Sequence, residues 1–217
     1  MKTVFAPGCA LFILNPELGE KISAYLFRRY NIEDIHTTCC HHKPEFGEET
    51  KIVCVCSGCV KRYDTLYEGV SAITLWDLID RDPDFRFPDY GGMKMAVLDA
   101  CPTRQYSAMH ETVRSLLKKM NIGPVEPERT KTNGKCCGDS FYGVLPKEQV
   151  IEKMKERADE MPAEDVAVYC VSCVKAVANG GKKPRYLPDL LFGVQSPVGE
   201  CDPDEWHRQI TDFISSH

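Results

Sequence analysis

The segment VCVCSGCVK at residues 53–61 decides how this chain is expected to fold. Its first part is a short apolar run of the kind that forms a buried strand. Its second part places the thiols of Cys56 and Cys59 where a helix would begin. The segment VYCVSCVK at residues 168–175 has the same order of apolar residues and the same CxxC spacing. This agreement indicates that one structural unit occurs twice in the chain.

The other cysteines extend this repeat over most of the chain. In each half a single cysteine comes first, an adjacent pair follows, and the CxxC motif comes last. The two sets are Cys9, Cys39, Cys40, Cys56 and Cys59, and Cys101, Cys136, Cys137, Cys170 and Cys173. The flanking segments ITLWDLI at 73–79 and RYLPDLL at 185–191 also correspond. We therefore interpret residues 1–90 and 91–200 as two homologous units, and 201–217 as a C-terminal helical segment.

Hydrophobic periodicity predicts strands that alternate with helices. Short apolar runs predict strands at 3–6, 51–55, 93–99 and 165–169. Apolar residues at helical spacing predict helices at 16–30, 106–120, 146–160 and 203–215. This alternation predicts an α/β fold with short parallel sheets flanked by helices, duplicated about a pseudo-two-fold axis. Each cysteine group would then lie at the carboxyl end of a strand, and the CxxC groups at helix N-termini, where backbone dipoles favour thiolates.

The composition is that of a globular protein with an unusual number of thiols. Apolar residues make up 43% of the 217-residue chain and charged residues 27%, which is enough for a buried core. The sequence has no apolar run that could span a membrane and no signal-peptide pattern, so we predict a cytoplasmic protein. It also has no basic run suited to nucleic acid. Twelve cysteines in that reducing compartment indicate metal binding or redox chemistry rather than structural disulfides.

Five thiols in each set favour iron–sulfur chemistry. Thiolates are soft anionic ligands, and adjacent cysteines such as Cys136 and Cys137 can reach two different irons. A structural zinc site needs only four ligands. The residues therefore favour one or two iron–sulfur clusters, with structural zinc and redox-active or unliganded thiols as the alternatives.

The second set also carries the pattern of a known family. Thirty-four residues separate Cys101 from the CCG motif at 136–138, and thirty-two separate Cys137 from the following CxxC motif. This arrangement resembles the CCG domain, the cysteine-rich module found in one subunit of heterodisulfide reductase and in related oxidoreductase subunits. The segment FAPGCAL at 5–11 is similar to the opening of that family, and the resemblance covers residues 3–193.

The resemblance implies a cofactor and an activity. In the cysteine-rich subunit of heterodisulfide reductase, each CCG domain holds a noncubane [4Fe–4S] cluster on its five cysteines, and a disulfide substrate is cleaved between the two clusters. Carried over residue by residue, the resemblance implies that both cysteine sets are cluster ligands and that no catalytic residue is separate from them. It implies an enzyme of anaerobic metabolism that reduces a small disulfide or thiol substrate.

The source of electrons is expected to lie outside this chain. No GxGxxG follows a predicted strand, and no CxxCxxC run suggests a ferredoxin-type cluster. We therefore expect a ferredoxin-like or flavoprotein subunit to deliver electrons. One alternative is a non-catalytic electron-transfer or scaffold subunit of a larger oxidoreductase complex. A second alternative is a binding module that zinc stabilises.

The first unit departs from the CCG pattern in two ways. Its cysteine pair is followed by His41 rather than glycine, and only fifteen residues separate Cys40 from Cys56, against thirty-two in the second unit. That interval is too short for a loop and a helix, so we expect a more open first site that could admit substrate, with a different cluster or no cluster at this site as the alternative. His41 and His42 are interpreted as solvent-facing, with ligation as the alternative.

Several residues outside the two sets complete the predictions. Cys54 is expected to be a small buried strand residue. Cys201 lies in a loop before the C-terminal helix and is interpreted as incidental. Four further polar residues near the predicted clusters could orient a substrate or adjust a redox potential, and none is assigned a catalytic role. They are Arg104, His110, Asp139 and Tyr142.

Overall fold

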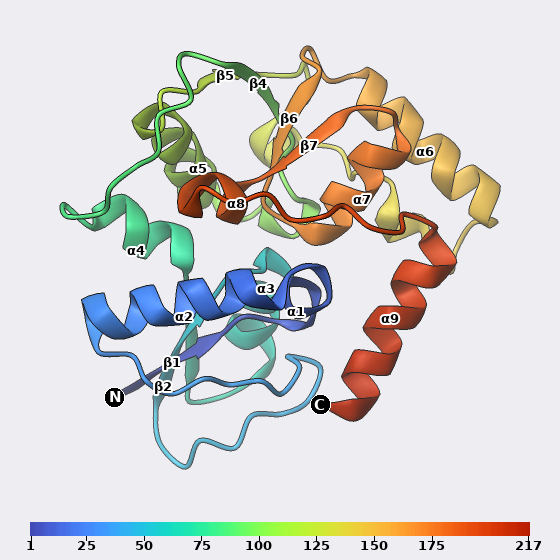
Figure 1. Ribbon diagram of the computed structural model, residues 1–217. Helices are drawn as coiled ribbons and strands as arrows, with labels where there is room; N and C mark the ends of the chain where they lie inside the picture. Colours follow the sequence, from blue (N-terminus) through green and yellow to red (C-terminus); the bar gives the residue numbers. More distant parts are fainter.

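The computed structural model describes residues 1–217 and contains two separate parallel β-sheets (Figure 1). The first has the order β1-β2-β3 and the second the order β5-β4-β6-β7. The strands are β1 Lys2–Ala6, β2 Thr50–Cys54, β3 Val70–Thr74, β4 Lys94–Val97, β5 Gly123–Val125, β6 Asp165–Val168 and β7 Lys183–Tyr186. Every pairing is parallel. The predicted α/β class with two short parallel sheets flanked by helices is confirmed.

Helices connect consecutive strands and cover the sheets. Those associated with the first sheet are α1 Cys9–Leu14, α2 Pro16–Tyr30, α3 Ser57–Leu66 and α4 Leu75–Arg81. Those of the second are α5 Ser107–Lys119, α6 Lys147–Asp159, α7 Val171–Asn179 and α8 Leu187–Phe192, with the 3₁₀ turns η1 Cys101–Thr103, η2 Lys131–Asn133 and η3 Asp139–Phe141. The last helix is α9 Pro203–Ser216. It descends from the second sheet's side of the molecule along the flank of the first (Figure 1).

Local sequence signals explain where the helices begin. The side chain of Asn15 accepts a hydrogen bond from the Leu18 N–H at 3.2 Å, and Pro16 fills the first helical position, so α2 begins where predicted. The carboxylate of Asp202 caps α9 in the same way. Predicted strand and helix bounds differ from those observed by no more than two residues, which is the usual uncertainty of helix and strand ends.

The two sheets are built in the same order. Strands β1, β2 and β3 correspond to β4, β6 and β7, and the bridge between Phe5 and Ile35 stands where β5 pairs with β4. Helix α2 of the first half packs against α8 of the second, and α4 of the first half packs against α5 of the second. Because α2 corresponds to α5 and α4 corresponds to α8 in chain order, these two contacts are equivalent. These correspondences support a duplication with units at 1–90 and 91–200, and both the duplication and these boundaries stay predictions.

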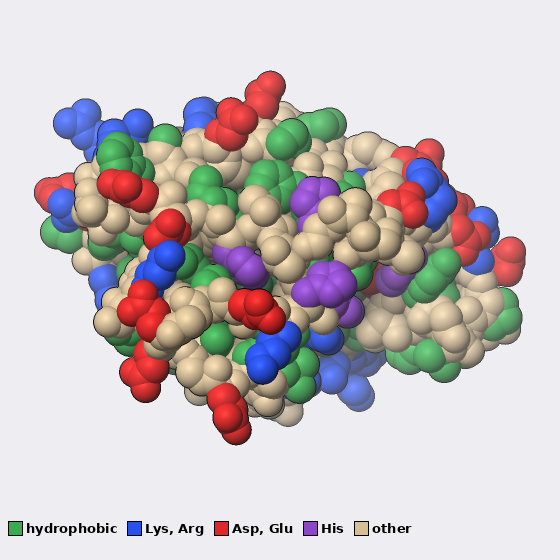
Figure 2. Space-filling model, turned by 90° about the horizontal axis from the view of Figure 1, so that it is seen from below, with side chains coloured by type: hydrophobic (Ala, Val, Ile, Leu, Met, Phe, Trp, Pro, Cys, Tyr) green, Lys and Arg blue, Asp and Glu red, His purple; other side chains and the backbone are tan.

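A single hydrophobic core runs through both halves. It includes the side chains of Trp76, Ile52 and Val53 on the first side and of Val166 and Leu116 on the second. Strands buried on both faces explain why the decisive segments read as continuous apolar runs rather than alternating ones. No helix is long and apolar enough to cross a membrane. On the face that Figure 2 shows, acidic and basic side chains are interspersed.

Candidate metal centres

The five cysteines of the first set converge at the carboxyl ends of β1 and β2. Cys9 opens α1, Cys56 is the N-cap of α3, and Cys59 lies in the first turn of α3. The pair Cys39-Cys40 reaches them from the loop between α2 and β2. Thiol contacts run in the order Cys9, Cys39, Cys40, Cys59 and Cys56.

The second set converges in the same order. Cys101 opens η1 after β4, Cys170 is the N-cap of α7, and Cys173 lies in the first turn of that helix. Thiol contacts run in the order Cys101, Cys136, Cys137, Cys173 and Cys170. The structure thus brings together every cysteine that the sequence grouped into a set. No disulfide joins any of them.

One thiolate in each set is stabilised by its neighbours. Hydrogen bonds from the thiols of Cys40 and Cys9 hold the pKa of Cys39 well below its usual range. Hydrogen bonds from Cys101 and Cys137 do the same for the pKa of Cys136. The Ser140 hydroxyl, at 2.9 Å, and the Gly138 N–H, at 3.4 Å, also donate to the Cys136 sulfur.

The helix starts favour a further thiolate in the first set. A hydrogen bond from the Cys59 thiol, with backbone N–H groups at the start of α3, lowers the pKa of Cys56 to about 7. Donating a hydrogen bond to Cys39 raises the pKa of Cys9, and donating one to Cys136 raises that of Cys101. Each set therefore combines at least one thiolate with thiols that donate to it.

The glycine of the CCG motif is required by helix α6. Gly138 has φ of 113°, and a Cβ built there would lie 2.7 Å from Met154 Cγ and 2.8 Å from Met154 N on α6. No helix follows the pair in the first half, so this restraint is absent there. His41 is exposed and does not have a positive φ. The missing helix and the replacement of glycine by histidine are thus one structural difference.

The two histidines after the first pair have different neighbours. The backbone N–H of His41 donates to the Cys39 sulfur, while its exposed ring is consistent with the predicted solvent-facing position. The Nε2 atom of His42 forms a hydrogen bond of 2.8 Å with the carbonyl oxygen of Ile214 on α9. Its ring therefore contacts the C-terminal helix.

The expectation of a more open first site is wrong. Cys39 is only 2% exposed, whereas its counterpart Cys136 is half-buried and lines a cavity of about 530 Å³. The first loop is held closed because the Tyr67 hydroxyl donates to the Cys40 carbonyl oxygen at 2.8 Å. In addition, α9 packs against α1 and stacks the Phe213 ring on Phe12.

The two cysteine sets face each other across the boundary between the sheets. Helix α1, which begins at Cys9, contacts α7, and η1, which begins at Cys101, contacts α3. The Tyr186 side chain is near cysteines of both sets, Cys56 and Cys170. Burial and these cysteines raise the pKa of Tyr186 well above its usual value, so its hydroxyl stays protonated. Sequence reasoning missed Tyr186, which aligns with Thr74.

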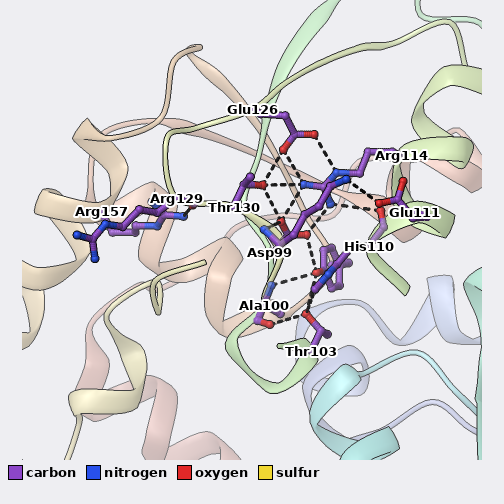
Figure 3. A network of polar contacts seen from close by, with 12 residues as sticks. Asp99, Ala100, Thr103, His110, Glu111, Arg114, Glu126, Arg129, Thr130 and Arg157 are labelled. Carbon is purple, nitrogen blue, oxygen red and sulfur yellow. Dashed lines mark hydrogen bonds and ion pairs between the residues drawn. The ribbon is translucent and has the colours of Figure 1, made fainter. Parts of the chain in front are cut away.

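A buried polar network supports the turn at Cys101 (Figure 3). Arg114 donates to both carboxylate oxygens of Asp99, at 2.6 and 2.8 Å. The Tyr169 hydroxyl donates to Asp99 at 3.0 Å and accepts from the Ala100 N–H at 3.2 Å. These bonds tie the residues just before Cys101 to the residue just before Cys170.

The remaining candidates take structural positions. Nε2 of His110 is 2.9 Å from the Thr103 hydroxyl, so this ring belongs to the same network. Asp139 is 3.0 Å from Nε2 of His207, whose ring stacks on Tyr142. Nε of Arg104 donates to the Gly134 carbonyl oxygen at 3.0 Å, and this side chain lines the cavity beside Cys136.

Two cysteines lie outside both sets, as predicted. Cys54 is fully buried at the end of β2. The Cys201 thiol donates to the Gly199 carbonyl oxygen at 3.5 Å, close to Lys175.

Neither the arrangement of possible metal ligands nor the comparisons with known proteins identify a cofactor. No three or more His, Cys, Asp or Glu side chains are arranged as ligands of one metal ion. No family model and no curated protein matches the chain. Among solved structures, Picrophilus torridus aspartate racemase matches 97% of this chain and 99% of its own, at 10% identity and a TM-score of 0.38. A likeness at that level carries no argument, so the CCG resemblance stays a prediction.

Proposed function

We propose that this chain is an iron–sulfur oxidoreductase that resembles the cysteine-rich subunit of heterodisulfide reductase. In the proposed reaction a disulfide takes up two electrons and two protons, its S–S bond breaks, and two thiols are released. A ferredoxin-like or flavoprotein partner supplies the electrons in the cytoplasm. The observation that supports this proposal most strongly is the convergence of two five-cysteine sets that face each other.

The donor atoms suit such a cofactor. Each set offers five sulfurs, including adjacent cysteines that can reach different irons and a CxxC pair at a helix start. When bound, a [4Fe–4S] cluster would supply one-electron redox chemistry at either set. We assign both complete sets as its ligands. They are Cys9, Cys39, Cys40, Cys56 and Cys59, and Cys101, Cys136, Cys137, Cys170 and Cys173.

Other residues of the chain serve the same reaction. The Ser140 hydroxyl and the Gly138 N–H donate to the Cys136 sulfur, and such hydrogen bonds raise the potential of a thiolate-bound centre. The Tyr186 hydroxyl stays protonated near cysteines of both sets, so it adds no negative charge there.

A second candidate function rests on the burial of the first set. Cys39, Cys40 and Cys59 are each no more than 6% exposed. A set so enclosed suits electron passage better than substrate binding, which favours a non-catalytic electron-transfer or scaffold subunit for that half. The half-buried Cys136 favours substrate access at the second set.

Metal and acid-labile sulfide analysis of anaerobically purified protein tests the proposal. We expect iron and sulfide in equal amounts, with at least one cluster's worth per chain, and an EPR signal in the oxidised form that changes when a thiol is added. A colourless protein that contains zinc and no iron contradicts it. A cluster whose EPR signal ignores thiols and disulfides supports the electron-transfer function instead.

A further inference from the structure

A cavity of about 530 Å³ opens beside the cysteine pair of the second set. Its volume lies in the range of pockets that hold small organic molecules. The end of η1, the CCG loop, η3 and one side of α6 form its walls. Arg104, Cys136 and Arg157 are among its lining residues.

The charges around this cavity are unbalanced. Four of its side chains are cationic and two are carboxylates, an excess of two positive charges. Glu160 pairs with both Lys135 and Arg157, and Glu156 pairs with Lys153. Arg104 forms no ion pair, and its Nε donates to a backbone carbonyl oxygen. Its remaining N–H groups are therefore available to an anionic ligand.

Arg157 is a second guanidinium in the cavity wall, and its hydrogen bonds hold it in place. Its side chain is only 3% exposed. Nη1 donates to Glu160 at 2.6 Å and Nη2 donates to the Arg129 carbonyl oxygen at 2.9 Å. The Nε–H is buried and has no partner. Because this nitrogen has almost no accessible surface, Arg157 adds positive charge to the cavity wall but no direct hydrogen bond to a ligand.

The first half offers nothing comparable. The position that corresponds to Arg104, three residues after the first cysteine of its set, is Phe12, which stacks on Phe213. Cys39, the counterpart of Cys136, is buried. Anion recognition is therefore a property of the second half alone.

We propose that this cavity binds a small anionic thiol or disulfide, with its anionic group held by Arg104 and its sulfur directed toward Cys136. The sulfur part of this inference rests on the proposed function, because a sulfur substrate is what the paired sets would reduce. Bidentate guanidinium groups bind carboxylate and phosphate by the same geometry, and both groups belong to the class proposed here.

Calorimetric titration of the full-length, anaerobically purified protein tests this inference. The probe is 3,3′-thiodipropionate, a dianionic thioether that cannot undergo disulfide exchange, and the comparison compound is its neutral diamide. We expect the dianion to bind at least about tenfold more tightly than the diamide, and this preference to weaken as salt is added, because the attraction is between charges.

Two variants on one helix provide a matched pair. Lys153→Gln removes a charge from the cavity wall, whereas Lys155→Gln removes the same charge from an exposed position of α6 outside the cavity. We expect Lys153→Gln and Arg104→Gln each to weaken dianion binding by roughly fivefold, on the scale of a lost charge-assisted hydrogen bond, and Lys155→Gln to leave it unchanged. Circular dichroism and thermal melting confirm that each variant is folded.

The results separate this inference from the proposed function. Equal affinity for dianion and diamide overturns the inference, as does an equal loss from Lys153→Gln and Lys155→Gln. If iron and sulfide are present and the dianion does not bind, the inference alone fails. If the dianion binds through Arg104 and no iron is found, the proposed function and the thiol or disulfide assignment fail, and the cavity is a site for a small anion only.

Discussion

The two cysteine sets share one order of thiol contacts but are supported in different ways. Behind Cys101, the second set rests on the buried ion pair of Asp99 and Arg114 and the hydroxyl of Tyr169. In the first half Pro7 stands at the position of Asp99 and Val55 at the position of Tyr169, and both are apolar and buried. One turn is thus held by directional hydrogen bonds and the other by packing. The cysteine pattern specifies the ligand group, and the neighbouring residues determine how it is held and reached.

The largest effect is expected from breaking the network behind Cys101. Arg114→Met would leave the Asp99 carboxylate buried without its partner, so we expect a loss of about 3–5 kcal/mol in the free energy of unfolding, measured by urea denaturation. The matched variant is Arg29→Met, which removes a half-exposed partner of Asp82 in the first half. Its loss should be clearly smaller. Equal losses would contradict a special dependence of the second half on buried polar contacts.

The CCG glycine should be far more sensitive to substitution than its counterpart. Gly138→Ala places a Cβ against Met154 at a positive φ, and we expect a loss of about 2 kcal/mol or more. His41→Ala, at the matching exposed position, should change the stability by no more than about 0.5 kcal/mol. Thermal and urea unfolding of both variants measure the difference. If Gly138→Ala is neutral, helix α6 does not impose this glycine.

Acid should weaken the second half through Asp99. Burial alone would raise the pKa of this carboxyl, but hydrogen bonds and charge from Arg114 outweigh it and hold the pKa below its ordinary value. A lowered folded-state pKa contributes stability above the unfolded value of about 3.9, and this contribution is lost as pH falls through the folded-state value. Unfolding measured from about pH 5 to about pH 2 should show this loss, and Asp99→Asn should reduce it. An unchanged acid dependence in Asp99→Asn would refute the assignment.

The smallest effect is expected where α9 covers the first set. Phe213→Ala removes the ring stacked on Phe12, and we expect a loss of about 1 kcal/mol together with faster alkylation of Cys39 in metal-free protein. Phe27→Ala, at a half-exposed position without a stacking partner, is the control. Alkylation of Cys39 that is the same in both variants would show that α9 does not restrict access to this set.

The sequence predicted the elements that depend on local patterns and the cysteines that belong together. Apolar runs located β1, β2, β4 and β6, the capping pair Asn15-Pro16 located the start of α2, and the repeated spacing grouped each cysteine set. The burial of Cys39 and the place of Tyr186 were missed because they depend on contacts between segments far apart in the sequence. Asp99 is a charged residue at the end of the apolar run 93–99 and two residues before Cys101, and this signal could have indicated the network.

Each five-cysteine set is proposed to hold an iron–sulfur cluster of its own. Iron and acid-labile sulfide should therefore be measured in wild-type protein and in two paired variants, Cys39→Ser/Cys40→Ser and Cys136→Ser/Cys137→Ser, after anaerobic reconstitution. We predict about eight irons per wild-type chain and about four in each variant, since each [4Fe–4S] cluster holds four. No more than one cluster's worth of iron in wild-type protein, or iron that is unchanged in both variants, would contradict the claim.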